Sequence, residues 1–420
     1  MDERRAQLFS IVLGWASPAV AREREGGCVV CNNSTLVVKQ LSRQTFAVTV
    51  VFSVFLSGCA SGRFGPDPDT APPKGPRTLK KLSVDERKAL LQRAQVWQAI
   101  DTSSLNLVAG PILPAAQRVG PQLTCAFSFP DKPLTGMTPK FQCAITKEDV
   151  VKVKYGEKNG EVYAEVAASR LLWALGFKAD TMEPTRVTCN GCPPDPFRTS
   201  SADWKLGSPA GVSTRVYDPA IIERDVPGDA IETPGYEGWA WPELEAASEK
   251  AGGATRAQID AFKLLAVFIQ HSDTKPDQQE IVCTAGRQKD ATGNETCGSP
   301  WLVIKDLGGT FGKATLTNNS KMNLGDWSGE TVWKDAKQCI GKLPRSFTGN
   351  LEDPKISEAG RAFLAQLLNR LSDRQLRDLF TVSQVLKRGE KIDGRVVTID
   401  DWVREFKKKR AEIVSARCPA

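Results

Sequence analysis

Two short polar stretches decide how the rest of the chain is interpreted: His271-Ser272-Asp273-Thr274-Lys275-Pro276-Asp277-Gln278 and Ile304-Lys305-Asp306-Leu307-Gly308-Gly309-Thr310-Phe311-Gly312. The first follows an apolar run typical of a buried helix, and the second begins at the end of a short apolar run typical of a strand. Each stretch alone is compatible with an ordinary turn, because Asp, Gly and Lys-Pro favour turns. Both together, in this order and behind a helix and a strand respectively, are much harder to explain by coincidence than either stretch alone.

The first stretch resembles the catalytic loop of protein kinases, and the second resembles the Asp-Phe-Gly metal motif of the same superfamily. The resemblance implies phosphoryl transfer from ATP, in which one carboxylate orients the acceptor hydroxyl and another holds a metal ion against the phosphates. It makes Asp273 and Lys275 catalytic, and Asp306 and Gln278 ligands of Mg²⁺ or Mn²⁺. His271 is the only histidine in the chain, and the resemblance gives it a structural role.

Several positions depart from the motifs of eukaryotic signalling kinases. Ser272 stands where those kinases have an arginine that clasps a phosphorylated activation loop, so this form of control is not expected. Gln278 stands in place of asparagine, which keeps the amide oxygen but adds one methylene group. The tail Leu307–Gly312 resembles HipA-type and secretory-pathway kinases, which points to the atypical members of the superfamily.

The two aspartates lie further apart in sequence than their counterparts in typical kinases. Cys283 and Cys297 bracket a polar segment between them, and removing this segment restores the usual spacing. The spacing therefore predicts a hairpin insertion that is closed at its base by a Cys283–Cys297 disulfide.

The phosphate-binding lysine is expected on a strand near residue 150. Residues Val151-Lys152-Val153-Lys154-Tyr155 alternate between apolar and charged side chains, which places both lysines on one face of the strand. The resemblance makes Lys154 the lysine that binds the α- and β-phosphates, with Lys152 as the alternate. The alternation by itself is equally compatible with a solvated strand face.

The resemblance assigns two further residues to the nucleotide site. A helix expected over residues 161–175 carries Glu165 at the edge of its buried face, where it can form an ion pair with Lys154. The turn Leu134-Thr135-Gly136-Met137-Thr138-Pro139-Lys140 resembles the turn that covers the nucleotide in HipA-type kinases, and this makes Gly136 a candidate. Because the turn has only one glycine, an ordinary hairpin turn remains the alternative.

The N-terminal region has the pattern of a bacterial lipoprotein. Residues 37–58 read as a signal peptide, with an apolar run over 46–56 that is too short to span a bilayer, and Leu56-Ser57-Gly58-Cys59 resembles the lipidation motif. Residues 1–36 are expected to be an extension that results from a start codon assigned too early. Residues 59–79 are rich in Pro and Gly and are expected to form a tether. A lipid anchor at Cys59 would hold the protein at a membrane surface in the bacterial cell envelope, on the periplasmic or extracellular face.

The cysteines agree with an oxidising compartment, because eleven are many for a reducing one. The eight cysteines after residue 80 allow four disulfides, and the sequence leaves their pairing open. Pairing of sequence neighbours predicts 125–143, 189–192, 283–297 and 339–418. A zinc site at Cys189 and Cys192 is rejected, since no second Cys-x-x-Cys motif follows at a suitable spacing and no histidine is free to join.

These observations predict an α+β, two-lobed protein-kinase-like fold, with a β-rich N-lobe and a leading helix over 80–180 and a hinge region and helical C-lobe over 181–420. The leading helix has its helical pattern over residues 80–105, with a capping box formed by Ser83 and Glu86, and two strands are expected around 185–188 and 212–217. The function expected is an atypical ATP-dependent kinase acting on a hydroxyl of a protein or glycan. The alternatives left open are a nucleotide-binding pseudokinase, a partner-binding envelope lipoprotein and a nucleotidyl (AMP) transferase on the same fold. The net charge of +7 is modest for 420 residues, so nucleic acid is not an expected partner.

Overall fold

The computed structural model describes residues 82–130, 134, 136, 138–199, 210–232, 238–289, 295–312, 321–344 and 349–419. The expected N-terminal extension, signal peptide and tether, together with Cys59, lie outside the described residues. The described part of the chain is a mixed α/β structure that combines helices with several sheets. Within that part, no helix has both the length and the apolar character needed to cross a membrane.

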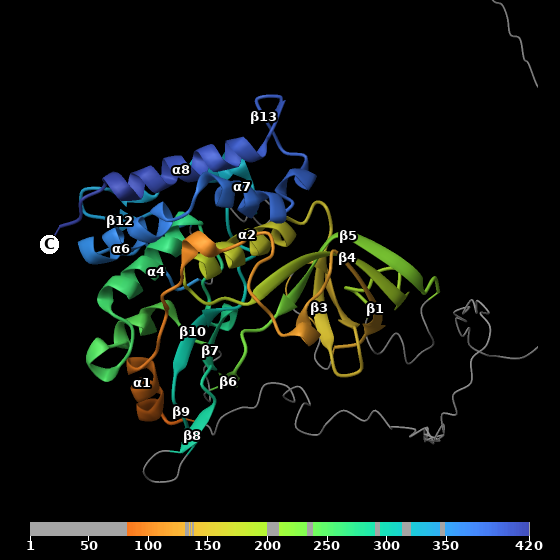
Figure 1. Cartoon of the computed structure of the whole chain (residues 1–420), viewed down its shortest axis with the longest axis horizontal. Helices are drawn as coiled ribbons and strands as arrows, with labels where there is room; N and C mark the ends of the chain where they lie inside the picture. The colour runs from red at the N-terminus through yellow and green to blue at the C-terminus, as the bar shows by residue number, and fades with distance from the viewer. Residues whose placement is uncertain are drawn as a thin grey trace, which may run out of the picture. The chain divides into compact units, whose positions relative to one another are not determined.

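Five strands form a closed barrel in the order β1-β2-β3-β5-β4 (Figure 1). Neighbouring strands are antiparallel except for β1 and β4, whose parallel pairing closes the barrel. Alternate residues point inward, as expected for strands with one buried face, and they form a separate apolar cluster that includes Leu123, Phe141, Val153, Val187 and Ile222. The strands are β1 (Gln122–Ser128), β2 (Lys140–Ala144), β3 (Val150–Tyr155), β4 (Thr181–Cys192) and β5 (Ser213–Arg224).

The barrel corrects the expected division of the chain at residue 180. Two of its strands, β4 and β5, lie beyond that position, so the boundary falls inside the sheet. Sequence patterns detect only the short segments 185–188 and 212–217 of these strands. The pairing of β4 with β5 shifts register between Thr185 and Val187 and again between Cys189 and Cys192, and such irregularities interrupt the alternation on which the prediction depends.

Helix α2 (Gly160–Ala174) follows β3 and is buried on almost every side. The Asn159 side chain accepts a hydrogen bond from the Glu161 amide at its start, and Gly176 follows its end with φ of +87°. A left-handed residue just after the last turn is a common helix terminus, and glycine adopts it without strain. The helix packs against β4, β5 and the later helix α7.

The helix expected over residues 80–105 is shorter in the structure. Helix α1 (Val84–Gln92) has the expected capping box between Ser83 and Glu86. Beyond it the chain is extended, because the Gln95 amide donates to the Pro300 carbonyl and Trp97 forms a bridge with Phe177. Tertiary pairing therefore overrides the local helical pattern after residue 93.

The remaining secondary structure lies after the barrel. A three-stranded sheet has the order β10-β7-β6, and small hairpins join β8 to β9, β11 to β12 and β13 to β14. The strands are β6 (Asp229–Ile231), β7 (Gln279–Cys283), β8 (Arg287–Lys289), β9 (Glu295–Cys297), β10 (Pro300–Ile304), β11 (Trp333–Asp335), β12 (Ile340–Gly341), β13 (Lys391–Ile392) and β14 (Arg395–Val396). The helices are α4 (Arg256–Phe268), α5 (Leu324–Ser328), α6 (Glu358–Asn369), α7 (Asp373–Val382) and α8 (Ile399–Ser415).

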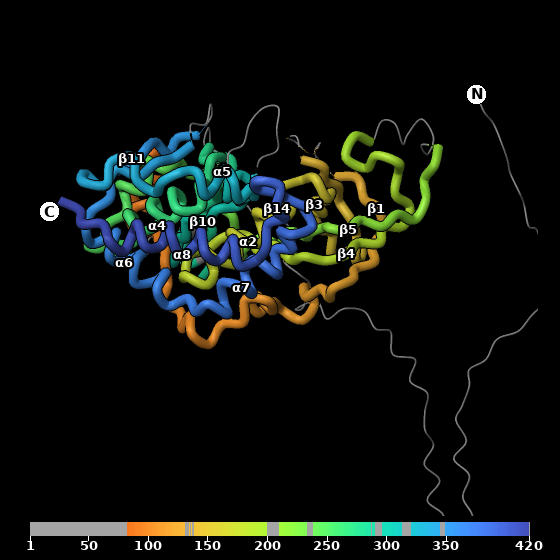
Figure 2. The backbone as a smooth tube through the Cα atoms, turned by 90° about the horizontal axis from the view of Figure 1, so that it is seen from above, coloured from red at the N-terminus to blue at the C-terminus, as the bar shows by residue number. Residues whose placement is uncertain are grey.

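The helices bury the largest apolar cluster of the described residues. Helix α4 packs against α6, and α8 covers both α6 and α7 (Figure 2). Aromatic rings fill the space between these elements, with Trp402 stacked on Trp327 at 5.7 Å and Phe380 at 5.2 Å from Trp402, measured between ring centroids. This packing forms the rigid support behind the two loops that the sequence singles out.

All four disulfides expected from sequence neighbours are present: Cys125–Cys143, Cys189–Cys192, Cys283–Cys297 and Cys339–Cys418. The expected insertion is confirmed as well, since the Cys283–Cys297 bond closes the hairpin of β8 and β9 at its base. The pairing of sequence neighbours that the sequence analysis predicts is therefore confirmed.

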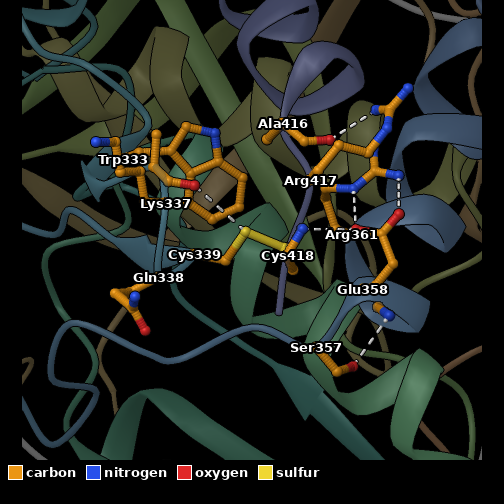
Figure 3. The surroundings of a disulfide bond; sticks show 12 residues. Trp333, Lys337, Gln338, Cys339, Ser357, Glu358, Arg361, Ala416, Arg417 and Cys418 are labelled. Atoms are coloured by element: carbon orange, nitrogen blue, oxygen red, sulfur yellow. Dashed lines mark hydrogen bonds and ion pairs between the residues drawn. A yellow bond between two sulfur atoms is a disulfide. The ribbon is translucent and has the colours of Figure 1, made fainter. Parts of the chain in front are cut away.

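The Cys339–Cys418 bond fixes the C-terminal end of the chain (Figure 3). The Cys418 amide donates to Glu358 at 2.8 Å, and Arg361 pairs with the same glutamate while donating to the Ile413 carbonyl. The hydrogen bonds from Arg361 and the Cys418 amide lower the pKa of Glu358 to about 2. The disulfide thus joins the chain after α8 to Cys339 beside β12, and hydrogen bonds from the Cys418 amide and from Arg361 join the end of α8 and the chain after it to the start of α6.

Replacing Cys339 and Cys418 together by serine is expected to lower the free energy of unfolding by about 2–4 kcal/mol, since the bond closes a long loop with a sequence separation of 79. The double serine variant at Cys189 and Cys192, where the separation is 3, is the matched control and should lose less. Denaturant unfolding of both oxidised variants measures the difference. Equal losses would contradict the loop-length argument.

Candidate active site

The loop after α4 begins with a buried histidine. The His271 side chain is fully buried, its amide donates to the Ala266 carbonyl, and its ring lies 6.3 Å from that of Trp241. Burial lowers the pKa of His271 to about 4, despite the opposing effect of Asp306. The ring is therefore neutral at ordinary pH, which agrees with a structural role.

Hydrogen bonds tie this loop to the one after β10. The Ser272 amide and hydroxyl both donate to the Gly309 carbonyl, at 2.8 and 3.0 Å, and the Phe311 amide donates to the Ile269 carbonyl at 2.7 Å. A Cβ atom at Gly309 would lie 2.9 Å from the Ser272 hydroxyl, so the close approach requires glycine. Phe311 is buried against Trp327 and anchors the second loop in the aromatic core. Two segments far apart in sequence are thus held in one geometry.

Asp306 occupies the centre of the site. One carboxylate oxygen accepts a hydrogen bond from the Gly308 amide at 2.8 Å, and the other lies 3.8 Å from the Lys154 ammonium. Burial alone would raise the pKa of Asp306, but Lys154, the Gly308 amide and Lys321 together hold it well below its usual range. Asp306 is therefore ionised at any physiological pH and offers oxygen ligands to a cation.

The barrel and α2 meet at a buried ion pair. The Lys154 ammonium, on β3, lies 2.5 Å from Glu165 on α2 and 3.3 Å from Glu223 on β5. The Lys154 side chain is 2% exposed and that of Glu165 is fully buried. Burial would lower the pKa of Lys154, yet Asp306, Glu165 and Glu223 raise it well above its ordinary value. Lys154 is consequently a permanent cation that joins three elements of the fold.

Only one of the two carboxylate oxygens of Glu165 has a hydrogen-bond partner among the described residues. Its second carboxylate oxygen is buried and has no hydrogen-bond partner among the described residues. Burial and the nearby Asp306 and Glu161 raise the pKa of Glu165, against the effect of Lys154. A Cβ atom at Gly308 would lie 2.9 Å from a Glu165 carboxylate oxygen, so the loop after β10 is packed tightly on α2.

Gln278 lies between Asp306 and Lys275. With its amide nitrogen toward Asp306, it donates to that carboxylate at 3.3 Å while its oxygen accepts from the Lys275 ammonium at 3.0 Å. The opposite orientation of the amide places its oxygen beside that of Asp306, where the two oxygens can bind one cation. The backbone supports this position, because the Lys305 amide donates to the Gln278 carbonyl at 2.9 Å.

Asp273 lies on the open side of the site, with a side chain that is 36% exposed. Burial raises the pKa of Asp273 to about 6. Lys275 and Lys321 oppose this shift, and Asp306 adds to it. The Lys275 ammonium lies 3.8 Å from Asp273 and 3.7 Å from Asp277. Asp273 can therefore exchange a proton near neutral pH, and Lys275 is the cation beside it.

Two further residues expected from sequence are not part of the ion pair between Lys154 and Glu165. Lys152 is partly exposed and forms its ion pair with Glu223, whereas Lys154 is buried and pairs with Glu165. Gly136 adopts φ of +85° in the turn before β2, and a Cβ atom there would lie 3.3 Å from the Lys140 ammonium. The other residues of that turn between 134 and 138 lie outside the described residues.

Three charged side chains at the site are missed by the sequence analysis. Glu223 contacts Lys154, Lys321 forms an ion pair with Glu161, and Lys140 lies opposite Lys154 in the pairing of β2 with β3. Glu223 had a signal, since it is a charged residue at the end of the apolar run Ala220–Ile222. Lys321 had none, because only the folded chain brings it to α2.

The comparisons with known proteins are sparse. No family model matches the sequence, and no curated protein matches it. Among solved structures, the chain is similar to a Helicobacter pylori proinflammatory kinase, CtkA, at 10% sequence identity and a TM-score of 0.35. The similarity covers 70% of this chain and 95% of that chain, and it is too distant to carry an argument about fold or function.

Replacing Lys154 by methionine is expected to lower the free energy of unfolding by about 3–5 kcal/mol, because the buried carboxylate of Glu165 then lacks its partner. Lys152→Met is the matched control on the same strand, and loss of its more exposed ion pair should cost about 1 kcal/mol or less. Urea unfolding curves give both values. Similar losses in the two variants would contradict the central role of Lys154.

Proposed function

We propose that this chain is an atypical ATP-dependent kinase with a two-lobed protein-kinase-like fold. In this proposal the barrel of residues 122–224 belongs to the N-lobe, and the helices from α4 onward form the C-lobe. The observation that carries it is the contact of Lys154 with Glu165 and Asp306 beside the loop that holds Asp273 and Gln278. A phosphate-binding lysine, a metal-binding carboxylate and a proton acceptor are the groups that phosphoryl transfer needs in one place.

The donor set fits a magnesium or manganese ion. Asp306 and Gln278 supply a carboxylate and an amide oxygen, which are ligands that hard divalent cations prefer. Asp306 and Gln278 would hold such an ion, which would supply positive charge to neutralise the phosphates of a bound nucleotide. Asp306 is ionised at all relevant pH values, so it can hold the ion without competition from protons.

The side chains of the site divide the remaining tasks. Lys154 stays charged and binds the α- and β-phosphates, while Glu165 keeps its ammonium in place. Asp273 orients the acceptor hydroxyl and accepts its proton as the bond from that oxygen to the γ-phosphorus forms and the bond to the β–γ bridging oxygen breaks. Lys275 lies beside Asp273, where it can balance charge on the phosphoryl group in transfer. The products are a phosphate ester and ADP.

The acceptor that we propose is a hydroxyl group of a protein or glycan in the bacterial cell envelope. Four disulfides support an oxidising compartment outside the cytoplasm. The proposed lipid anchor at Cys59 would hold the enzyme at a membrane surface, on the periplasmic or extracellular face. Peptide mapping for a lipid-modified Cys59 tests this part of the proposal directly.

ATP with Mg²⁺ is expected to raise the melting temperature of the oxidised protein and to have no such effect on Asp306→Ala. A ligand at 100 times its dissociation constant adds about 2.7 kcal/mol to the stability of the native state. Asp85→Ala, at an exposed acidic position on α1, is the matched control and should respond like the unmodified protein. Equal responses in Asp306→Ala and the control, or no response in any protein, would refute the nucleotide site.

Radiolabel then separates the alternative reactions. Transfer of label from γ-labelled ATP to an acceptor identifies a kinase, whereas transfer from α-labelled ATP alone identifies an AMP transferase. Nucleotide binding without any transfer identifies a pseudokinase.

The phosphoryl-transfer rate is expected to fall as the pH drops below about 6, because the raised pKa of Asp273 leaves it protonated there and unable to accept the hydroxyl proton. Asp273→Asn should reduce kcat by about 10²- to 10⁴-fold and remove this dependence. Asp277→Asn, a nearby carboxylate that also faces Lys275, should keep it. A pH–rate profile with the same acidic limb in Asp273→Asn would rule out Asp273 as the proton acceptor.

A further inference from the structure

Three carboxylates beside the proposed phosphate site lie together at one end of the barrel. Asp180 precedes β4 and Asp225 follows β5, and these strands pair antiparallel with Thr181 opposite Arg224. The pairing therefore brings Asp180 and Asp225 side by side, next to Glu223 near the end of β5. One carboxylate oxygen of each of the three lies within 4.8 Å of the others.

Asp180 is the member of this cluster that has a buried carboxylate oxygen without a hydrogen-bond partner among the described residues. Its side chain is buried, with the residue 1% exposed; one oxygen accepts a hydrogen bond from the Val226 amide at 3.0 Å. The other oxygen is buried and has no hydrogen-bond partner in the described part of the chain. An ionised carboxylate in this position costs several kcal/mol unless a positive charge or a proton compensates it.

The basic side chains that the structure describes around the cluster form their ion pairs with Glu223 or with carboxylates outside the cluster, and not with Asp180 or Asp225. Lys152 pairs with Glu223 from the barrel side, Lys305 lies 3.5 Å from Glu280, and Arg224 forms two hydrogen bonds with Asp149. Among the described residues, neither Asp180 nor Asp225 has an ion pair with a lysine or arginine. Asp225 is exposed, so the open side of the cluster faces solvent.

We propose that Asp180, Glu223 and Asp225 form a binding site for a hard divalent cation of the size of Ca²⁺, separate from the site of Asp306 and Gln278. All three donors are carboxylate oxygens, which Ca²⁺ prefers. Oxygens that bind one Ca²⁺ at about 2.3–2.6 Å lie up to about 5 Å apart, which accommodates the observed spread. Mg²⁺ would require the oxygens to draw together to about 4.2 Å. Water on the side of Asp225 completes the coordination.

The cation site is connected to the phosphate-binding lysine through Glu223. One oxygen of Glu223 lies 3.3 Å from the Lys154 ammonium. A cation at the cluster takes up negative charge of Glu223 and leaves Lys154 more fully available to Glu165, Asp306 and phosphate. Binding of the cation and of ATP is therefore coupled. This last step alone rests on the proposed function; the cation site itself does not.

The test measures Ca²⁺ binding to the oxidised full-length protein without nucleotide, by calorimetry and by the shift in melting temperature. The unmodified protein is expected to bind one Ca²⁺ and to melt at a higher temperature with it. Asp225→Asn, an exposed position where folding is not at risk, should weaken Ca²⁺ binding at least about tenfold. Asp85→Asn is the matched control and should bind like the unmodified protein.

Two further variants keep the outcome decisive. Asp180→Asn removes a buried charge without changing the shape of the side chain. In the absence of Ca²⁺ this variant should be at least as stable to unfolding as the unmodified protein, and Ca²⁺ should no longer raise its melting temperature. Asp306→Asn should lose the response to ATP with Mg²⁺ and keep the response to Ca²⁺, which separates failure of this site from failure of the kinase site.

Several results would overturn the cation site. One is the lack of Ca²⁺ binding up to about 1 mM, the weak end of protein calcium sites; this would mean that a proton on Asp180 satisfies the cluster. Others are unchanged binding in Asp225→Asn, or loss of binding only in Asp306→Asn. Tighter binding of Mg²⁺ than of Ca²⁺ would overturn the assignment to an ion of the size of Ca²⁺.

Discussion

The buried ammonium of Lys154 is the constraint on which the rest of the structure depends. It lies within 4 Å of carboxylates from α2, from β5 and from the loop after β10, so each of these elements must dock on β3 in one register. A charge in this environment has a high cost unless it is surrounded by opposite charge. A shift of α2 by one residue would separate Glu165 from Lys154 and leave the Glu165 carboxylate buried without its ion pair. The same interaction therefore sets the fold and assembles the site.

The second constraint is the attachment of two loops to an aromatic core. Ser272 binds the Gly309 carbonyl, and Phe311 lies between these loops and Trp327. Because the tie uses backbone groups and a buried ring, it leaves the carboxylates of Asp273 and Asp306 free for chemistry. The neutral His271 behind them adds bulk without adding charge. In the same short segments, backbone groups and a buried ring hold the two loops together, while the carboxylates are available for the proposed reaction.

The sequence predicted those features that depend on short-range patterns. The capping box at Ser83, the helix expected over 161–175 and the pairing of the cysteines follow from local signals, and the structure contains all of them, with the helix at Gly160–Ala174. The choice of Lys154 and Glu165 as a pair followed from the resemblance to protein kinases together with strand alternation and helix position, and the two side chains form an ion pair. The boundary at residue 180 failed because strand pairing between β4 and β5 is long-range and irregular. Glu223 was missed for the same reason, since only the register of β3 with β5 places it beside the two lysines.

The barrel explains how so many acidic groups can lie close together. Like charges repel, and a chain that can relax will move them apart. Here Glu223 lies on β5 and Asp180 directly precedes β4, and both strands belong to a closed barrel. Two disulfides, Cys125–Cys143 and Cys189–Cys192, lie within the strands of this barrel. These crosslinks limit the freedom of the unfolded chain, and the stability they contribute offsets the electrostatic cost of the acidic cluster. A concentration of carboxylates that costs stability is retained most readily where it binds a cation, and this is the physical reason to associate the barrel end with an ion.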